Sequence, residues 1–167
     1  MTSRRSGGFS FIELIVTLVM MGVVSAVAVI NIRAQDQHSA TVQADQFRRN
    51  LSHLQLLAIS QGARLKLTVA STGYSVCLAA TATCNAANSI NDPATGSGFS
   101  VTLTDSVSFT VGTGDYYFHS LGRPVTAETG AALITGTTTF SLNGVGRATA
   151  VDVTVLPITG FAQTNYH

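Results

Sequence analysis

The sequence predicts an α+β protein, in which one long N-terminal helix packs on an antiparallel β-sheet head. Two observations lead to this prediction. Residues 9–62 contain no proline and show helical periodicity in their second half, whereas short runs of alternating apolar and polar residues follow from residue 64 onward. The chain has 167 residues, enough for one domain with a terminal extension.

The predicted helix begins in an apolar run from Phe9 to Ile30, preceded by Arg4 and Arg5. As a helix this run of about 22 residues would be roughly 33 Å long, which is enough to cross a bilayer. Gly22 lies inside it and is a candidate flexible point. The polar exceptions in the run are Ser10, Glu13, Thr17 and Ser25.

Glu13 is the residue in this run that most needs a partner. A charged side chain inside a membrane-spanning helix costs about 2.5–3.5 kcal/mol near the middle of the helix and less near its end. A passive anchor has no use for such a charge. We therefore expect a group of opposite charge to compensate the Glu13 carboxylate.

The second half of the predicted helix is amphipathic. Its apolar residues recur at spacings of three and four, at Ala44, Phe47, Leu51, Leu54 and Ala58. We expect this stripe to pack against the β-rich remainder of the chain rather than against another protein. Gly62 is the predicted C-terminal cap.

The residues after Gly62 predict strands separated by turns. A low-complexity loop is expected from Ala79 to Gly98, and a hairpin turn at residues 143–146. The predicted strands are Arg64–Val69, Gly73–Leu78, Phe99–Leu103, Val107–Val111, Tyr116–Ser120, Thr137–Leu142 and Val151–Leu156.

Cys77 and Cys84 are the two cysteines of the chain. An even number at short separation in an exported protein indicates a disulfide, and two free thiols are the alternative. Closing so small a loop would stabilise the fold by about 2–3 kcal/mol. No second pair of Cys or His lies at the spacing of a zinc site, so no metal is expected.

The composition argues against several functions. Charged residues are 10% of the chain and the net charge is +1, so binding to nucleic acid is not expected. The four histidines are scattered, and no nucleophile accompanies Asp115 and His119. We therefore expect neither catalytic residues nor a cofactor, and we do not expect an enzyme.

Gly8-Phe9, followed by Ser10-Phe11-Ile12-Glu13-Leu14, resembles the processing site of type IV pilin-like proteins. The resemblance implies that prepilin peptidase cleaves between Gly8 and Phe9 and N-methylates Phe9. It also implies that Glu13 compensates the terminal amine of a neighbouring subunit when the helices assemble into a filament. Major pilins of the family often have a proline where this chain has Ile30.

Two short segments of the head, Phe118–Pro124 and Val155–Phe161, look like the minor pilin C of the MSHA type (the mannose-sensitive haemagglutinin pilus), within the wider GspH/FimT-like group. The resemblance thus implies a minor pilin of an MSHA-type pilus with a type IV pilin fold. The alternatives are a minor pseudopilin of type II secretion and, less favoured, a tip adhesin or DNA-uptake pilin.

The resemblance divides the chain into a cleaved leader (1–8), a transmembrane or filament-core half-helix (9–30), an amphipathic half-helix (31–62) and a β-rich head (63–167). It implies residence in the bacterial inner membrane before assembly, and in a periplasmic or extracellular filament afterwards. The implied partners are prepilin peptidase, the inner membrane and other pilin or pseudopilin subunits.

Two other interpretations of the N-terminus remain open. A secretory signal would use Ser25-Ala26-Val27-Ala28 as its cleavage site, although it would then contain a carboxylate within an unusually long apolar region. An uncleaved single-pass anchor would leave Glu13 without compensation. The mature N-terminus distinguishes these interpretations.

Overall fold

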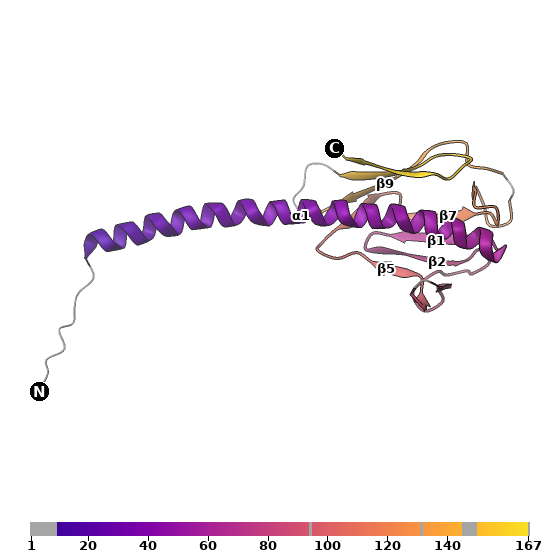
Figure 1. Cartoon of the computed structure of the whole chain (residues 1–167), viewed down its shortest axis with the longest axis horizontal. Helices are drawn as coiled ribbons and strands as arrows, with labels where there is room; N and C mark the ends of the chain where they lie inside the picture. The colour runs from indigo at the N-terminus through magenta and orange to yellow at the C-terminus, as the bar shows by residue number, and fades with distance from the viewer. Residues whose placement is uncertain (1–9, 94, 131, 145–149, 167) are drawn as a thin grey trace, which may run out of the picture. The chain divides into compact units, whose positions relative to one another are not determined.

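The computed structural model describes residues 10–93, 95–130, 132–144 and 150–166, with the side chains of residues 26–38 left out of the description (Figure 1). The chain divides into two units, Met1–Gln35 and Asp36–His167. The division lies within the long helix, so that the second unit includes the end of this helix as well as all the strands. The α+β class predicted from the sequence is confirmed.

Helix α1 spans Phe11–Gln61 and continues through Gly22 without interruption. Gly62 ends it as predicted. The Gly62 N–H donates to the carbonyl of Ile59, and the Ala63 N–H donates to that of Ala58, which is the Schellman arrangement of a helix C-terminus. This arrangement places Gly62 at a φ of 59°, which glycine adopts without steric cost.

The second unit contains two main antiparallel sheets where a single sheet was expected. The first has the strand order β5-β2-β1-β7-β8, the second has the order β11-β10-β9-β6, and a small hairpin pairs β3 with β4. The strands are β1 (Leu65–Ala70), β2 (Gly73–Leu78), β3 (Asn91–Asp92), β4 (Ser97–Gly98), β5 (Ser100–Thr102), β6 (Ser108–Val111), β7 (Gly114–Phe118), β8 (Pro124–Val125), β9 (Thr138–Asn143), β10 (Val151–Val155) and β11 (Ala162–Tyr166).

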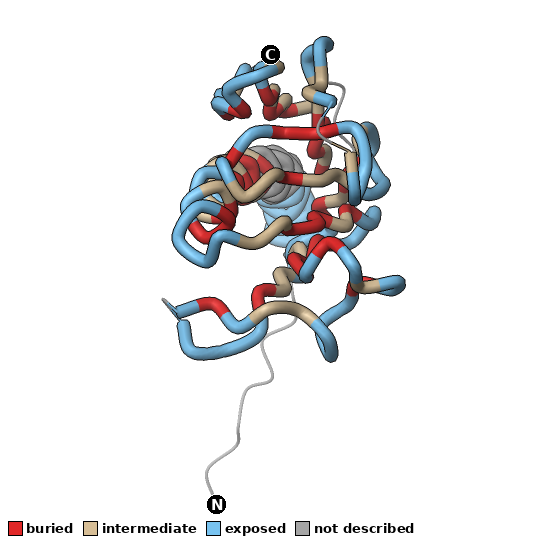
Figure 2. The backbone as a smooth tube through the Cα atoms, turned by 90° about the vertical axis from the view of Figure 1, so that its right-hand side faces the viewer, coloured by how far each residue is buried: buried red, intermediate tan, exposed pale blue. Residues whose placement is uncertain are grey.

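The core forms where the amphipathic part of α1 meets both sheets. All five predicted stripe residues are buried, and Ala40 and Leu57 extend the stripe. Phe47 lies at the centre of this core. Its ring makes edge contacts with the ring of Tyr74 in the first sheet, at a centroid distance of 4.8 Å. It makes similar contacts with the rings of Phe109 and Phe140 in the second sheet, at centroid distances of 5.0 Å each. The buried residues of α1 and of both sheets belong to one hydrophobic cluster, and buried segments are red in Figure 2.

All seven predicted strands are present, with ends displaced by at most two residues. The β9–β10 hairpin is confirmed by the register, in which Leu142 pairs with Val151. The turn residues 145–149 lie outside the described part of the chain. The largest displacement is in β7, which begins at Gly114 rather than Tyr116 because it pairs with Val69 of β1 from that residue onward.

Three features of the head were not predicted. The last strand, β11, was missed because its Gln163-Thr164-Asn165 centre lacks apolar alternation, yet it pairs along its whole length with β10. The two-residue strand β8 was also missed. The predicted 79–98 loop contains the β3–β4 hairpin, whose turn follows Asp92.

Residue 9 of the predicted membrane segment 9–30 lies outside the described part of the chain, and so do the side chains of residues 26–30. Within the described part, no helix meets the length and apolarity required to cross a membrane.

Candidate assembly site in the first turns of helix α1

Glu13 is the third residue of α1 and lies in its first turn. The backbone carbonyl of Ser10 accepts hydrogen bonds from the N–H groups of Glu13 and Leu14, at 3.0 and 3.2 Å, and so begins the helix. The Glu13 side chain is exposed. Among the described residues, no hydrogen bond or ion pair reaches its carboxylate.

The hydroxyl groups farther along this stretch differ from Glu13 because they donate hydrogen bonds to backbone carbonyls of the same helix. Thr17 Oγ1 donates to the carbonyl of Leu14 at 2.9 Å, and Ser25 Oγ donates to that of Met21 at 2.7 Å. Such bonds allow a hydroxyl to lie in an apolar environment at little cost. A carboxylate cannot donate to a backbone carbonyl, so Glu13 needs a donor from elsewhere.

The side chains around Glu13 are apolar and exposed. Those of Phe11–Val24 that are large and apolar have exposed fractions between 42% and 79%: Phe11, Ile12, Leu14, Ile15, Val16, Leu18, Val19, Met20, Met21, Val23 and Val24. Exposed apolar area of this extent marks a surface that meets lipid or protein. Glu13 is thus the acidic group of an apolar surface.

A second effect also favours an acid at this position. The first turn of a helix carries the positive end of the helix dipole, so a carboxylate there is favourable by about 0.3–1 kcal/mol. This contribution is smaller than the cost of placing the charge in lipid, which is about 2.5–3.5 kcal/mol near the middle of a span. The dipole alone therefore leaves much of that cost uncompensated.

The predicted cleavage site, Gly8 and Phe9, lies outside the described residues. The sequence comparisons bear on this segment instead. Residues 3–29 match the family model of the prokaryotic N-terminal methylation motif. The match contains Gly8, Phe9 and Glu13, and it stops before the amphipathic part of α1.

Comparisons with curated proteins and with solved structures give little further information on function. No curated protein matches the chain significantly. A solved structure of the type IV minor pilin FimU of Pseudomonas aeruginosa is similar over 78% of this chain and 90% of that chain, with 12% identity and a TM-score of 0.48. A likeness of this degree does not indicate a ligand or a partner.

Cys77 and Cys84 are joined by a disulfide in the structure, with an S–S distance of 2.07 Å. Lys66 lies beneath the same loop and is only 3% exposed. Its ammonium group donates to the carbonyls of Thr81 and of Ala82, the latter at 3.2 Å. The alternating pattern of β1 places Lys66 on the face opposite Leu65 and Leu67, but gives no sign that the disulfide loop covers it.

Asp115, His53 and Asp92 are engaged in structural contacts. Asp115 accepts a hydrogen bond from Thr68 Oγ1 at 2.6 Å, which binds its carboxylate to β1 rather than to His119. His53 Nε2 lies 2.9 Å from Asp92 Oδ1, joining α1 to the β3–β4 hairpin. Among the described residues, no group of three or more His, Cys, Asp or Glu could hold a metal ion.

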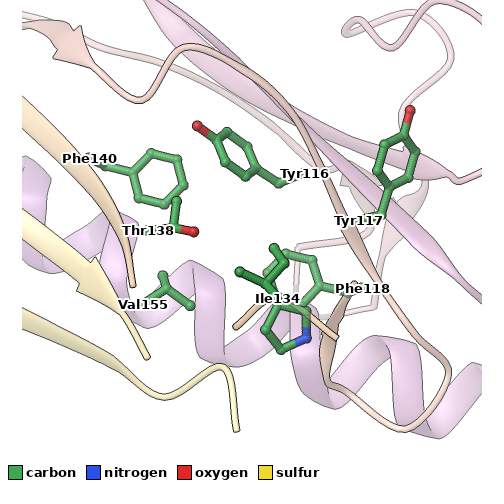
Figure 3. Close-up of a pocket in the computed structure, with 8 residues that line it drawn as sticks. Tyr116, Tyr117, Phe118, Ile134, Thr138, Phe140 and Val155 are labelled. Carbon is green, nitrogen blue, oxygen red and sulfur yellow. The ribbon is translucent and has the colours of Figure 1, made fainter. Parts of the chain in front are cut away.

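A small apolar pocket lies between the two sheets (Figure 3). It measures about 10 Å³, roughly the space for one water molecule, so it is a packing gap rather than a ligand site. Tyr116 lies at its edge and donates its hydroxyl to the carbonyl of Gly112 at 3.1 Å. Burial raises the pKa of Tyr116 above its usual value. The lining residues are Tyr116, Tyr117, Phe118, Pro124, Ile134, Thr138, Phe140 and Val155.

Proposed function

We propose that this chain is a minor subunit of a type IV pilin-like filament, processed at Gly8–Phe9 and assembled through α1. One observation carries the proposal: Glu13 has no partner among the described residues, and it lies in an exposed apolar stretch that matches the N-terminal methylation motif.

The proposed chemistry of assembly is charge compensation between subunits. Cleavage after Gly8 would expose the amine of Phe9, which N-methylation leaves basic. In a bundle of such helices, the Glu13 carboxylate of one subunit would pair with the Phe9 amine of the next. Each charge offsets the loss of water by the other, since opposite charges attract strongly where the dielectric constant is low.

The same proposal assigns roles to the remaining segments. Residues 1–8 are a leader kept in the cytoplasm by Arg4 and Arg5, and residues 9–30 hold the subunit in the bacterial inner membrane before assembly. Residues 31–62 and the β-rich head, 63–167, extend into the periplasm. After assembly, the apolar half-helix exchanges lipid for the helices of other pilin subunits.

The finer assignment is to a minor pilin of the MSHA type, supported by the short head segments 118–124 and 155–161. A minor pseudopilin of type II secretion would use the same cleavage, the same acid and the same helix. Co-purification distinguishes the two systems: the tagged chain is expected with subunits of a pilus, whereas recovery with subunits of a secretion pseudopilus would replace the finer assignment.

The central test compares Glu13→Ala with Thr17→Ala in cells that assemble the filament. Thr17 is the matched control, because its hydroxyl is satisfied within the helix. Both variants should be cleaved and recovered in the membrane fraction. Glu13→Ala should enter filaments at least about tenfold less, the scale expected when a buried charge loses its partner, whereas Thr17→Ala should enter normally.

Mass spectrometry of the mature subunit tests the processing step. The expected N-terminal residue is methylated Phe9. An assembled subunit that retains Met1, Arg4 and Arg5 would contradict the proposal, as would normal filament entry by Glu13→Ala. A mature chain beginning at Val29 would instead identify a secretory signal.

A further inference from the structure

The turn between β7 and β8 brings two basic residues together. The His119 N–H donates to the carbonyl of Arg123 at 2.8 Å, and the Gly122 N–H donates to that of His119 at 2.7 Å. Gly122 has a φ of 75°, and a Cβ added there would lie 2.9 Å from Ile59 Cδ1. Gln55 Nε2 also donates to the Gly122 carbonyl at 2.9 Å. Helix α1 therefore holds this turn in one conformation.

The strand register places the two basic side chains on one face. Tyr117 pairs with Val125 and Phe118 pairs with Pro124, so the next opposed pair is His119 and Arg123. Residues directly opposite in an antiparallel pair project to the same side, and so do residues two positions apart on a strand. His119 and Arg123 thus share a face with buried Val125.

This face forms a pocket of about 190 Å³. Since one water molecule needs roughly 10–15 Å³ of such space, the pocket has room for a small organic group. It is lined by Leu121, Val125 and Leu133 in addition to the two basic residues. Val125 and Leu133 are joined by an isolated β-bridge, so the apolar part of the lining is supported by backbone pairing.

The backbone determines which nitrogen of His119 carries a proton in the neutral ring. The Leu121 N–H donates to His119 Nδ1 at 3.2 Å, so Nδ1 is an acceptor and the proton lies on Nε2. The Ser120 hydroxyl is also 3.3 Å from Nδ1. Nε2–H remains as a donor, and no acceptor for it occurs among the described residues.

Arg123 supplies donors of a second kind. Its guanidinium group has N–H donors and no acceptor, and within the described ranges no ion pair or hydrogen bond engages it. Arg123 and the Nε2–H of His119 thus present hydrogen-bond donors to one pocket, without an acceptor for them among the described residues. A carboxylate in the pocket would accept hydrogen bonds from both side chains.

We propose that this pocket binds a carboxylate attached to a small apolar group, such as the C-terminal residue of a peptide. Arg123 would bind the carboxylate, His119 Nε2–H would donate a further hydrogen bond, and the apolar group would contact Val125 and Leu133. The apolar lining favours an organic acid over an inorganic anion. This site is separate from Glu13 and does not depend on filament assembly.

Isothermal titration of the full chain in dodecyl maltoside micelles, which carry no carboxylate, tests the proposal. The probes are N-acetyl-Ala-Val with a free C-terminus, the same peptide as its amide, and 3-methylbutanoate. We expect the free peptide to bind and the amide to bind at least about tenfold more weakly, because the charge-assisted hydrogen bonds are lost. Binding of 3-methylbutanoate as well would indicate that a free acid suffices, whereas its failure would identify a peptide terminus as the ligand.

The variants locate the binding. Arg123→Gln should weaken binding of the free peptide by about tenfold or more. Arg49→Gln, which removes the same charge from an exposed position on α1, should leave it unchanged. Unfolding of each variant in denaturant is measured alongside, to show that the head is intact. Equal binding of acid and amide, no binding of either peptide, or unchanged binding by Arg123→Gln would each overturn the proposal.

Discussion

Two stretches of the same helix differ in how far their apolar side chains are exposed. From Phe11 to Val24, the large apolar side chains are 42–79% exposed. From Ala40 to Ala58, the apolar stripe is at most 4% exposed, because it packs into the core with both sheets. Both stretches belong to one uninterrupted α-helix.

The difference follows from the distribution of polar residues around the helix. The second stretch carries polar side chains on one side and the apolar stripe on the other, so packing one face against the sheets is enough to bury its apolar side chains. The first is apolar on all sides, and a helix of that kind requires a surrounding that is apolar throughout. The chain supplies the partner of the second stretch, whereas in the proposed function lipid, and later other subunits, supply that of the first.

Truncation of a large side chain in each stretch should give the largest contrast. Phe47→Ala removes a ring that touches both sheets and should lower the free energy of unfolding of the head by about 3–5 kcal/mol. Val16→Ala, at an exposed position, should change it by less than about 0.5 kcal/mol. Denaturant unfolding of the full chain in micelles measures both. An equal loss in the two variants would show that the two stretches are not independent.

Alkaline pH should destabilise the fold at Tyr74, which contacts Phe47 and Asn50 of the second stretch, because burial disfavours the charged phenolate. Asn50 Nδ2 donates to the Tyr74 hydroxyl at 2.7 Å, and burial raises the pKa of Tyr74 to about 12 from the model-compound value of 10.0. The folded state therefore keeps the proton at pH values where the unfolded state has lost it. The stabilisation is complete below pH 10 and is lost as the pH rises toward 12.

Tyr74→Phe tests this dependence. At neutral pH the variant should be destabilised by about 1–2 kcal/mol, because the hydrogen bond with Asn50 is lost. Its stability should fall less steeply than that of the native chain above pH 10. The readout is the denaturant midpoint at a series of alkaline pH values; parallel curves for the two proteins would refute the assignment to Tyr74.

The same substitution at Gly22 in the first stretch and at Gly62, which follows the second stretch and ends the helix, should give the smallest contrast. Gly62→Ala places a Cβ at a φ of 59° and should destabilise the head by about 1 kcal/mol. Gly22→Ala meets no atom within 4 Å and should leave unfolding of the head unchanged. Thermal unfolding followed by near-ultraviolet circular dichroism measures both. A loss at Gly22 alone would reverse the comparison.

The helix and most strands could be predicted because their signals are local. Apolar residues at spacings of three and four predict the buried stripe around Phe47, and Gly62 predicts the end of the helix. The division of the strands into two sheets was not predictable in this way, because it depends on which strands pair across the fold. Strand β11 was not predicted for a similar reason, because its polar residues are held by pairing with β10 and by a hydrogen bond to the helix.

The candidate assembly site was easier to identify from sequence than the contacts in the head. Glu13 stands out because it is a charge in an apolar run. Lys66 does not, since a lysine in an alternating strand is ordinarily solvent-exposed, and its burial depends on the loop closed by Cys77 and Cys84. The pairing of His119 with Arg123 likewise required the register of β7 and β8.

The contacts of strand β11 have a consequence for the time course of folding. Thr164 Oγ1 and the Tyr166 hydroxyl both donate to the Asp45 carboxylate, across separations of 119 and 121 residues. Strand β11 also forms one edge of the second sheet. A chain emerging from the ribosome therefore makes its helix first but cannot complete this sheet until residues 162–166 have been synthesised. Because contacts of such long range slow folding, the helix spends an interval with its stripe uncovered, when a chaperone could bind it.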